Sequence, residues 1–581
     1  MKNVQVVAEN ATMQSFLNCY LKETGNFHIE SANGTVKKIT CPLSNQGIDL
    51  TIDVKYWSET GRHLFEFPLY YQTGKETKPI DYVTLAALIT KELALMHNQV
   101  DAEDELILRV ILSCKNLKKY LEHRLRDSNH LSSNEFNYIE AEQSLIFGHL
   151  LHPTPKSKQG ITEEEDNRFS PEMNGKFQLH YFLATDTQVV QDSSLSVSAQ
   201  DIIQGELPKE ELVTDEAGAL IPAHPLQARA LLKKASVQQM LKENKLKYLG
   251  PLGSEFTATS SFRTVYSPES KYMYKFSVPI KITNSLRMNQ QKELDRGVEV
   301  SRLLQTALGD DLKRNFPDFH VISDPAYIRV DIPGEEEVSL DCIIRENPFY
   351  GNDSDAILAA GLGQDHPFGE QSRLYSIIHR IAEKENRSLQ AASEDWFKRY
   401  LSITLDPVLW LYETYGIALE AHQQNSIVQL KDGYPDSFYY RDNQGYYFRE
   451  KKADELRQLL PTLNEKSDTI CTEAIAEERL RYYFFFNHLF GVINGFGANG
   501  LIAEEDLLRV LRERLETHHK QAGDAKPLLH SLLTNEKLPS KANLLTRFHD
   551  MDELIGSLET QSVYTMAANP LVQKAGVTSE T

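Results

Sequence analysis

The hydrophobic pattern changes twice along this chain of 581 residues, and this restricts the fold more than any other feature. Residues 1–145 show helical spacing, with two alternating strand-like segments that predict a hairpin. From about 175 to 350 segments rich in β-branched and aromatic residues dominate, and after Pro367 helical spacing returns. Because helices and strands are grouped and do not alternate strictly, the pattern predicts an α+β protein of several domains with largely antiparallel sheets.

Composition and charge argue against several classes of protein. Hydrophobic residues make up 41% of the chain and charged residues 25%, as in globular proteins. No stretch approaches the ~18 consecutive apolar residues of a membrane helix. The net charge of −20 argues against nucleic acid or an anionic membrane as a partner. The five cysteines form no CxxC pair and residues 1–30 show no secretory signal, so we expect a cytoplasmic protein without a disulfide framework.

Polar residues are concentrated directly after an apolar helical segment, in GIALEAHQQN at 416–425. This loop holds Glu420, His422 and Asn425, and Asp442 ends the second of two strand-like segments that follow. Mg²⁺ prefers oxygen ligands and substrate phosphates, so the group predicts a metal–nucleotide site. For a single Glu or His, a polar loop cap would be the simpler interpretation.

A second polar segment, TSSFRT at 259–264, precedes a predicted strand over 272–283. Its four hydroxyl groups and the Arg263 guanidinium can donate to phosphate oxygens, although a polar hairpin turn is the alternative. Alternation along the strand puts Lys275 on the face opposite Tyr274, as a fixed positive charge beside this turn.

Further polar residues follow at the end of that predicted strand, where we expect a ligand cleft. They are Thr283, Asn284 and Arg287. Together with Arg263 and Lys275, Arg287 would complete a clamp for a triphosphate and a carboxylate.

Two histidines and a lysine lie beside a proline turn in GHLLHPTPK at 148–156. The prolines restrict the backbone, so His152 and Lys156 would lose little freedom on meeting an anion, or they are ordinary loop residues. Arg479 precedes an aromatic segment, 482–496, that predicts a buried helix, and Lys541 starts a predicted short helix. Composition alone places Arg479 and Lys541 at the surface.

The sequence contains no GxxxxGK[ST], no convincing GxGxxG and no GxSxG. It therefore lacks the motifs of Walker-type ATPases, dinucleotide-binding enzymes and α/β-hydrolases. The chain instead resembles the siderophore synthetases that work independently of nonribosomal peptide synthetases, the family of the aerobactin synthetases. The segments that carry the resemblance are GHLLHPTPKSKQG (148–160), AHPLQ (223–227), TSSFRT (259–264), KFSVPIKITNSLR (275–287), IIREN (343–347), GIALEAHQQNSIV (416–428), RDNQG (441–445) and KANLLTRF (541–548).

Within the family, ATMQSFLNCYLKETG (11–25) and ENPFY (346–350) are most similar to the branch that activates citrate for petrobactin. The resemblance implies a hand-like shape: a mainly helical thumb with a hairpin over 1–145, β-rich, ATP-binding fingers over 146–368 and a palm over 369–581. Family members are commonly homodimers.

The resemblance also implies the reaction. A substrate carboxylate, here of citrate, attacks the α-phosphate of ATP and releases pyrophosphate, and an amine then displaces AMP to form an amide. The amine would be a polyamine, spermidine or an acyl-spermidine. Adenylation brings two anions together, so it needs cations and a metal more than a nucleophile.

The resemblance assigns roles residue by residue. The nucleotide phosphates would be held by Ser260, Ser261, Arg263, Thr264 and Lys275. Arg287 and His422 would bridge the carboxylate and the α-phosphate, and with Lys275 they are the predicted catalytic residues. Glu420 and Asp442 would hold Mg²⁺, with Asn425 nearby. The remaining carboxylates of citrate would be bound by His152, Thr283, Arg479 and Lys541.

One departure from the family and two alternative functions remain. Many relatives have proline where this chain has Leu150, which puts a role for His149 in more doubt than one for His152. A kinase-like phosphotransferase would also use a loop such as 420–425 followed by Asp442, but it would produce ADP. A non-enzymatic binder of citrate or a ferric siderophore would explain the cations and would turn over no nucleotide.

Overall fold

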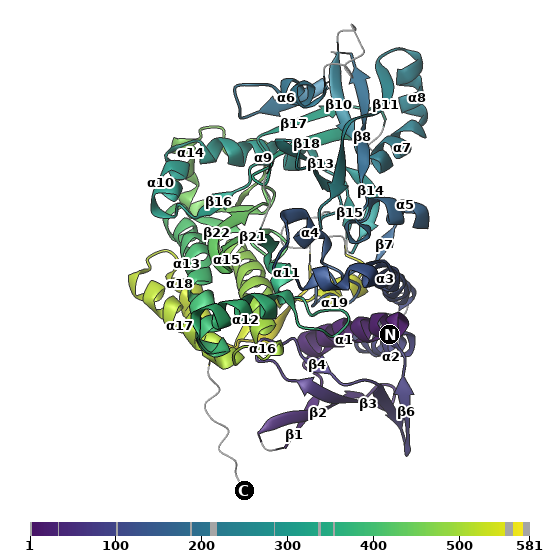
Figure 1. Cartoon of the computed structure of the whole chain (residues 1–581), viewed down its shortest axis with the longest axis vertical. Helices are drawn as coiled ribbons and strands as arrows, with labels where there is room; N and C mark the ends of the chain where they lie inside the picture. The colour runs from purple at the N-terminus through teal and green to yellow at the C-terminus, as the bar shows by residue number, and fades with distance from the viewer. Residues whose placement is uncertain are drawn as a thin grey trace.

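The computed structural model describes residues 3–32, 34–99, 103–185, 189–208, 218–283, 285–334, 339–351, 355–551 and 562–572, so Asn284 lies outside the described residues. Three groups of elements surround a common centre (Figure 1): an N-terminal sheet with its helices at the bottom, a strand-rich group at the upper right and a helix-rich group at the left. The sheets are mostly antiparallel, which confirms the α+β prediction.

The N-terminal group contains more strand than the predicted hairpin. Its described strands form one antiparallel sheet in the order β1-β2-β3-β5-β6, with β4 beside β3. Outer strands β1 and β6 are almost fully exposed and polar, so they lack the alternation from which strands were predicted. The strands are β1 (His28–Ala32), β2 (Thr35–Leu43), β3 (Ile48–Tyr56), β4 (Leu64–Phe65), β5 (Leu69–Thr73) and β6 (Glu76–Ile80). The helices are α1 (Val4–Thr24), α2 (Tyr82–His97), α3 (Glu103–Arg124), η1 (Leu125–Leu131) and α4 (Tyr138–Gln143).

The middle group is built on an antiparallel sheet in the order β10-β8-β11-β12-β13-β18-β17-β9, and a small sheet β15-β14-β7 adjoins it. The strands of the larger sheet are β8 (Phe177–Ala184), β9 (Val189–Ser193), β10 (Ala219–Ala223), β11 (Leu246–Ala258), β12 (Thr264–Tyr266), β13 (Tyr272–Phe276), β17 (Ala326–Val330) and β18 (Leu340–Glu346). Those of the smaller sheet are β7 (Lys158–Gln159), β14 (Val278–Ile282) and β15 (Ser285–Arg287). The helices are α5 (Glu163–Phe169), η2 (Pro171–Met173), α6 (Ala199–Glu206), α7 (Pro225–Leu232), α8 (Ala235–Lys242), α9 (Gln291–Leu304) and α10 (Ala307–Asn315).

The single strand predicted over 272–283 is wrong, because the chain leaves one sheet after β13 and enters the other as β14. The break is at Ser277, whose buried hydroxyl donates to the Asp341 carboxylate (2.7 Å) and accepts from the Asn289 N–H (2.8 Å). These hydrogen bonds hold the Ser277 side chain at the point where the chain passes from one sheet to the other. Lys275 and Arg287 therefore reach the centre of the molecule from two different sheets.

The C-terminal group consists of long helices around small sheets, in the orders β16-β22-β21-β19 and β20-β23-β24, with a separate pair β25-β26. The strands are β16 (Phe319–Val321), β19 (Ala356–Leu358), β20 (Ile417–Leu419), β21 (Ser426–Lys431), β22 (Tyr434–Tyr440), β23 (Tyr446–Arg449), β24 (Ile470–Cys471), β25 (Lys537–Lys541) and β26 (Tyr564–Ala568). The helices are α11 (Ala359–Gly363), α12 (Arg373–Glu385), α13 (Leu389–Tyr415), η4 (Glu450–Lys452), α14 (Ala453–Leu459), α15 (Glu473–Leu480), η5 (Arg481–Leu489), α16 (Phe490–Ala498), α17 (Glu504–Gln521), α18 (Lys526–Thr534) and α19 (Asn543–Phe548).

Each group has its own hydrophobic core, but segments distant in sequence join it. Leu544 and Phe548 of α19 pack with Phe16 of α1 in the N-terminal core. Val300 of α9 packs with Trp396 of α13 in the C-terminal core. The domain ranges predicted from the sequence remain a prediction, and these crossings tie the three groups together.

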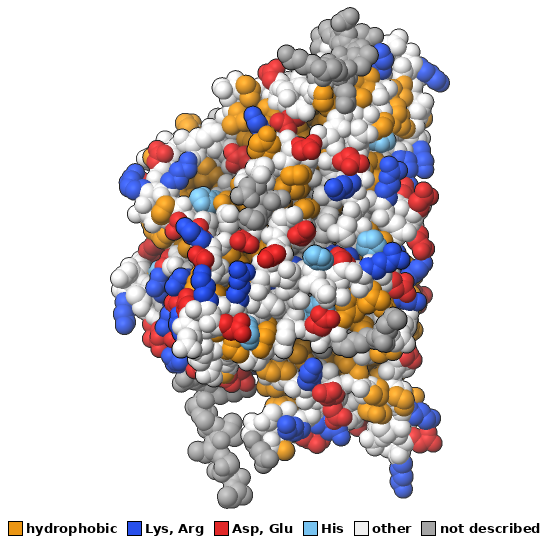
Figure 2. Space-filling view, viewed as in Figure 1, with side chains coloured by type: hydrophobic (Ala, Val, Ile, Leu, Met, Phe, Trp, Pro, Cys, Tyr) orange, Lys and Arg blue, Asp and Glu red, His pale blue; other side chains and the backbone are white. Residues whose placement is uncertain are grey.

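The described surface and helices bear on the predicted partners. On the face shown in Figure 2, basic side chains lie among acidic ones. No helix within the described ranges combines the length and apolarity needed to span a bilayer. All five cysteines are buried and free.

Candidate active site

The three groups line a cavity of about 480 Å³. Every residue to which the family resemblance gave a role lines this cavity. These are His152, Ser260, Ser261, Arg263, Thr264, Lys275, Thr283, Arg287, Glu420, His422, Asn425, Asp442, Arg479 and Lys541. We call the side formed by residues 259–264, Lys275 and Arg287 the cationic wall, and the side formed by residues 420–425 and Asp442 the acidic wall.

The cationic wall begins with the tight turn between β11 and β12. Phe262 takes a left-handed conformation there (φ 68°), which is uncommon for a bulky residue and indicates that the surroundings hold the turn. The Ser261 hydroxyl accepts from the Thr264 N–H (3.2 Å), and the Ser260 N–H donates to Glu142 (2.8 Å). Arg263 donates to Asn289 (2.7 Å), so its guanidinium is oriented before any ligand binds.

Lys275 lies on β13 directly opposite Thr264, with 6% of its surface exposed. The alternation predicted for this strand holds over β13, because Tyr274 and Phe276 pack into the middle core while Lys275 lines the cavity. Burial, and next the charge of Arg263, lowers the pKa of Lys275 to about 7. An incoming phosphate would strongly stabilise the charged form of a lysine whose pKa is lowered in this way.

Arg287 comes from the small sheet and approaches the cavity beside Thr283. Its Nη2 donates to the Ile282 carbonyl and the Thr283 hydroxyl, both at 3.3 Å. Thr283 itself has a left-handed conformation (φ 53°), which turns the chain toward β15.

The acidic wall carries two carboxylates, Glu420 and Asp442. Burial, and next the charge of Asp442, raises the pKa of Glu420 to about 7, and the Tyr447 hydroxyl donates to it (2.9 Å). Burial also acts to raise the pKa of Asp442. The Lys275 ammonium and other neighbouring donors have a larger combined effect, so the pKa of Asp442 is lowered overall. The Asn425 side chain donates to Asp442 (2.9 Å), and this hydrogen bond fixes the 420–425 loop to the segment that follows β22.

His422 sits between these carboxylates and the cationic wall. Burial lowers the pKa of its imidazole, and Asp442 acts in the opposite direction, so the ring is neutral near pH 7. Both ring nitrogens face donors: the Gln424 N–H lies 3.2 Å from Nδ1, and the Asn425 side-chain amide lies 3.0 Å from Nε2.

Arg479 and Lys541 are buried, so their placement at the surface from composition is wrong. Arg479 belongs to the last turn of α15 and donates to the Tyr564 hydroxyl (3.1 Å), and Lys541 ends strand β25 and does not start a helix. The Lys541 ammonium lies 5.8 Å from the ring centre of Tyr483. Aromatic rings stabilise these cations where water is excluded.

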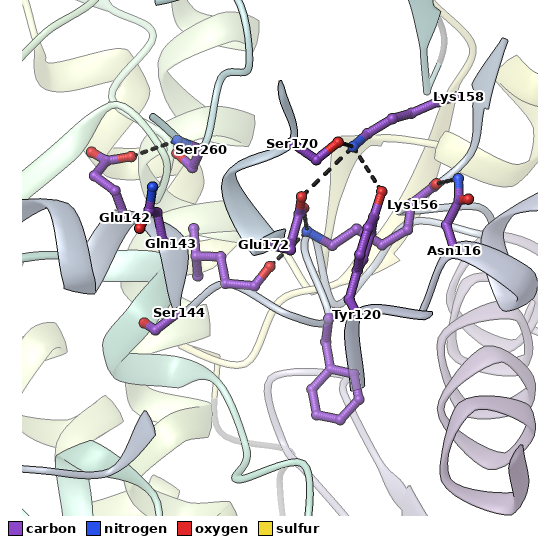
Figure 3. Close-up of polar contacts among 12 residues, drawn as sticks. Asn116, Tyr120, Glu142, Gln143, Ser144, Lys156, Lys158, Ser170, Glu172 and Ser260 are labelled. Carbon is purple, nitrogen blue, oxygen red and sulfur yellow. Dashed lines mark hydrogen bonds and ion pairs between the residues drawn. The ribbon is translucent and has the colours of Figure 1, made fainter. Parts of the chain in front are cut away.

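Lys156 and Lys158 line the same cavity but are engaged in a buried network (Figure 3). The Lys156 ammonium donates to the Leu145 carbonyl (2.6 Å) and pairs with Glu172. The Lys158 ammonium donates to the Tyr120 hydroxyl (2.8 Å) and the Ser170 hydroxyl (2.7 Å). Because both ammonium groups are paired with the buried carboxylates of Glu172 and Asp166, these lysines brace the wall of the cavity and their charges are largely compensated.

The comparisons with known proteins agree with this site. Over 100% of both chains, the protein is 45% identical to the spermidine-citrate ligase of Bacillus anthracis. It is 35% identical to the rhizobactin siderophore biosynthesis protein RhbC of Rhizobium meliloti, over 97% of this chain and 98% of the relative. Residues 137–364 match the IucA/IucC family. The chain belongs to the IucA/IucC family of siderophore synthetases.

Structural comparison gives the same answer. ATP-bound aerobactin synthetase IucA of Klebsiella pneumoniae superimposes with a TM-score of 0.89 at 29% identity, over 97% of this chain and 100% of the other. The resemblance predicted from the sequence is therefore confirmed at the level of the family, the fold and a biosynthetic ligase. Residues 394–556 also match a family described as ferric iron reductase FhuF-like transporter.

Two ion pairs of this IucA/IucC protein escaped the sequence analysis. Arg345 on β18 lines the cavity and pairs with buried Asp324 (2.6 and 2.9 Å), and it belongs to the IIREN segment that was noted only as a family match. Arg441 pairs with buried Glu142 and donates to the Ser260 hydroxyl (3.1 Å), which joins the acidic wall to the cationic wall. Glu142 gave no local signal, because its partner is almost 300 positions away.

The donor set fits one Mg²⁺ of the kind that substrate phosphates complete. Within the described residues no group of three or more His, Cys, Asp or Glu has metal-binding geometry, so Glu420 and Asp442 would act as a pair. Mg²⁺ typically takes one or two carboxylates and fills its other positions with water and phosphate. The raised pKa of Glu420 reflects two acidic groups in one dry site, which a cation would relieve.

Proposed function

We propose that this enzyme uses ATP to adenylate a carboxylate of citrate and joins it to spermidine or an acyl-spermidine through an amide, releasing AMP and pyrophosphate. The observation that carries the proposal is the pairing of the cationic wall with the acidic wall in one cavity. Two anions must meet in adenylation, and this arrangement offers charges of both signs without an activated nucleophile. The name of the relative that is 45% identical supports citrate and spermidine as substrates.

The cationic wall would bind the nucleotide. The hydroxyl groups of the 259–264 turn and the Arg263 guanidinium would donate to the β- and γ-phosphates, and Lys275 would add its charge beside them. Mg²⁺ held by Glu420 and Asp442 would neutralise the phosphate charge, so that the carboxylate can approach. Asn425 would keep Asp442 in place through the hydrogen bond that it already makes.

Arg287 and His422 would act at the reacting atoms. Arg287 lines the same cavity as the 259–264 turn, Arg479 and Lys541, and it would contact both the citrate carboxylate and the α-phosphate. The neutral His422 imidazole lines the cavity and would donate its ring N–H as a hydrogen bond to oxygens whose charge builds in the transition state.

The far end of the cavity would bind the rest of citrate. Arg479, Lys541 and His152 are buried, Thr283 is partly exposed, and all four line the cavity with donors of the type that fixed carboxylates require. The Arg479 guanidinium lies 5.9 Å from the ring centre of Tyr447 and the Lys541 ammonium 5.8 Å from that of Tyr483, so aromatic faces would help to hold both cations toward citrate.

Pyrophosphate release tests the reaction class and the acid together. Purified enzyme with ATP and Mg²⁺ should release pyrophosphate with citrate and hydroxylamine, and far less with 2-oxoglutarate or succinate. Spermidine should then replace hydroxylamine and give a citryl-spermidine amide by mass spectrometry. ADP and phosphate as products would contradict the proposal in favour of phosphotransfer, and no turnover with any acid would favour a binding protein.

The same proposal includes a homodimer in the cytoplasm. The family resemblance supports the dimer, and five free buried cysteines suit a reducing compartment. Sedimentation of the purified chain at micromolar concentration would give one species of twice 66.3 kDa if the dimer is correct.

A further inference from the structure

A π-helical segment, η5, lies against the acidic wall and carries residues that the proposed mechanism does not use. π-Helical turns are rare and are frequent at functional sites. Here the wider turn lets Tyr483 and Asn487 line the cavity while His488, the next residue, is completely buried.

Three contacts connect this segment to the loop at 420–425. The Asn487 side-chain oxygen accepts from the Gln423 N–H (3.1 Å), and the His488 carbonyl accepts from the Gln423 amide (3.4 Å). One turn later, Gly491 leaves room for the same side chain, because a Cβ at Gly491 would lie 1.8 Å from Nε2 of Gln423. The segment therefore encloses Gln423 on several sides.

The His488 side chain makes the third contact, and its chemistry is determined by its neighbours. Nδ1 lies 2.8 Å from the Ala421 carbonyl, which can only accept, so Nδ1 carries the proton. Nε2 is then an acceptor, and the buried Tyr400 hydroxyl of α13 donates to it. Burial lowers the pKa of His488 to about 4, so the ring stays neutral in this tautomer at working pH.

Ala421 stands between Glu420 and His422, two of the predicted functional residues of the loop. A donor that holds its carbonyl therefore sets the direction in which both neighbouring side chains point. We propose that Tyr400, His488 and Asn487 are positioning residues that orient the 420–425 loop so that Glu420 and His422 face the substrates. The effect on catalysis rests on the proposed function, but the orientation of the loop does not.

Two substitutions at His488 distinguish the effect of the hydrogen bond that His488 donates to Ala421 from the effect of the space that its ring fills. The amide nitrogen of His488→Asn can occupy the place of Nδ1 and still donate to Ala421, whereas His488→Leu cannot. We expect His488→Leu to lower kcat about 100-fold, as small misplacements of catalytic groups do, with KM for ATP changed much less. His488→Asn should recover at least about tenfold of that loss.

Tyr400→Phe removes the hydroxyl that donates to His488, and because it removes nothing else the protein should still fold. Its matched control is Tyr248→Phe, which deletes a tyrosine hydroxyl bonded to His180 (2.7 Å) in the middle sheet, away from the cavity. We expect a several-fold fall in kcat for Tyr400→Phe and none for Tyr248→Phe. Equal rates for both variants would overturn the proposal, even if His488→Leu fails to fold.

Hydrogen exchange of the 420–426 segment gives a readout that does not depend on activity. The Gln423 and Asn425 amides should exchange faster in Tyr400→Phe and His488→Leu than in the parent chain, and not in Tyr248→Phe. Unchanged exchange would overturn the proposal. If the parent released no pyrophosphate with citrate but exchange still rose, the proposed function would fall and the positioning role would stand.

Discussion

The two walls of the cavity are held in place in different ways. On the cationic wall, Thr264 and Lys275 are paired across two neighbouring strands, so backbone register sets their relation. On the acidic wall, Glu420 follows a three-residue strand and depends on tertiary contacts, from Tyr447 to its own carboxylate and from η5 to the adjoining loop. A site for two anions needs rigid cations, whereas a wall that is proposed to bind a metal must adjust to ligands that arrive with the substrate.

The largest effect should come from the cationic wall. Arg287→Ala should lower kcat for citrate-dependent pyrophosphate release by about 10²–10³, because a donor to developing charge is lost in a dry site. The measurement is steady-state pyrophosphate release with a thermal unfolding curve of the same sample. Arg302→Ala, which removes a surface pair with Asp192, is the control and should keep full activity. A folded Arg287→Ala with normal release would refute the role of Arg287.

The acidic wall should respond through magnesium. Glu420→Gln should weaken the apparent Mg²⁺ affinity by at least about tenfold, since losses of 10- to 100-fold follow even indirect damage to metal ligands. Because the pKa of Glu420 is raised to about 7, the parent enzyme should need more Mg²⁺ as pH falls from 8 to 6, and the variant should lose this dependence. Glu385→Gln is the control, since Glu385 also accepts from a tyrosine, Tyr434 (2.9 Å), outside the cavity. Identical Mg²⁺ titrations for parent and Glu420→Gln would argue against metal binding there.

Lys275 gives the cationic wall a pH dependence of the opposite direction. With a pKa of about 7, Lys275 is increasingly neutral as pH rises through 7, so ATP binding must restore its proton. We expect proton uptake on ATP binding at pH 8, and less at pH 6, seen by calorimetry in buffers of different ionisation enthalpy. ATP affinity should fall by up to about tenfold per pH unit above 7. Lys275→Met should show no such uptake, and uptake that persists in this variant would contradict the assignment.

The smallest effect should come from the backbone that joins Glu420 to Asp442. A Cβ at Gly445 would lie 2.5 Å from Cβ of Glu420 and 2.9 Å from the Tyr440 hydroxyl, so something must move. Gly445→Ala should lower the free energy of unfolding by about 1–3 kcal/mol, as overpacking does, with a modest loss of Mg²⁺ affinity. Gly205→Ala, where nothing lies within 4 Å, is the control and should not destabilise. If both variants unfold at the same denaturant concentration, the close packing at Gly445 is not a constraint.

Much of the cationic wall could be predicted because its signals are local. Hydroxyl groups beside an arginine, followed by an alternating strand, placed Lys275 on the correct face of β13. The same reasoning predicted that this strand continues to residue 283. It ends before Ser277, which donates to Asp341 and accepts from Asn289, and no local pattern reveals these partners. The exposed strands β1 and β6 were missed for the related reason that they bury almost nothing.

The sequence by itself determined the α+β class, the family and a set of residues that line one cavity, because these depend on residue types in a fixed order. Only the tertiary structure decided that Arg479 and Lys541 are buried, that Glu142 and Arg441 link the two walls, and that His488 supports the loop at Ala421. The physical reason is distance along the chain. A buried charge or donor is stable only beside a partner, and here those partners come from segments that the fold alone brings together.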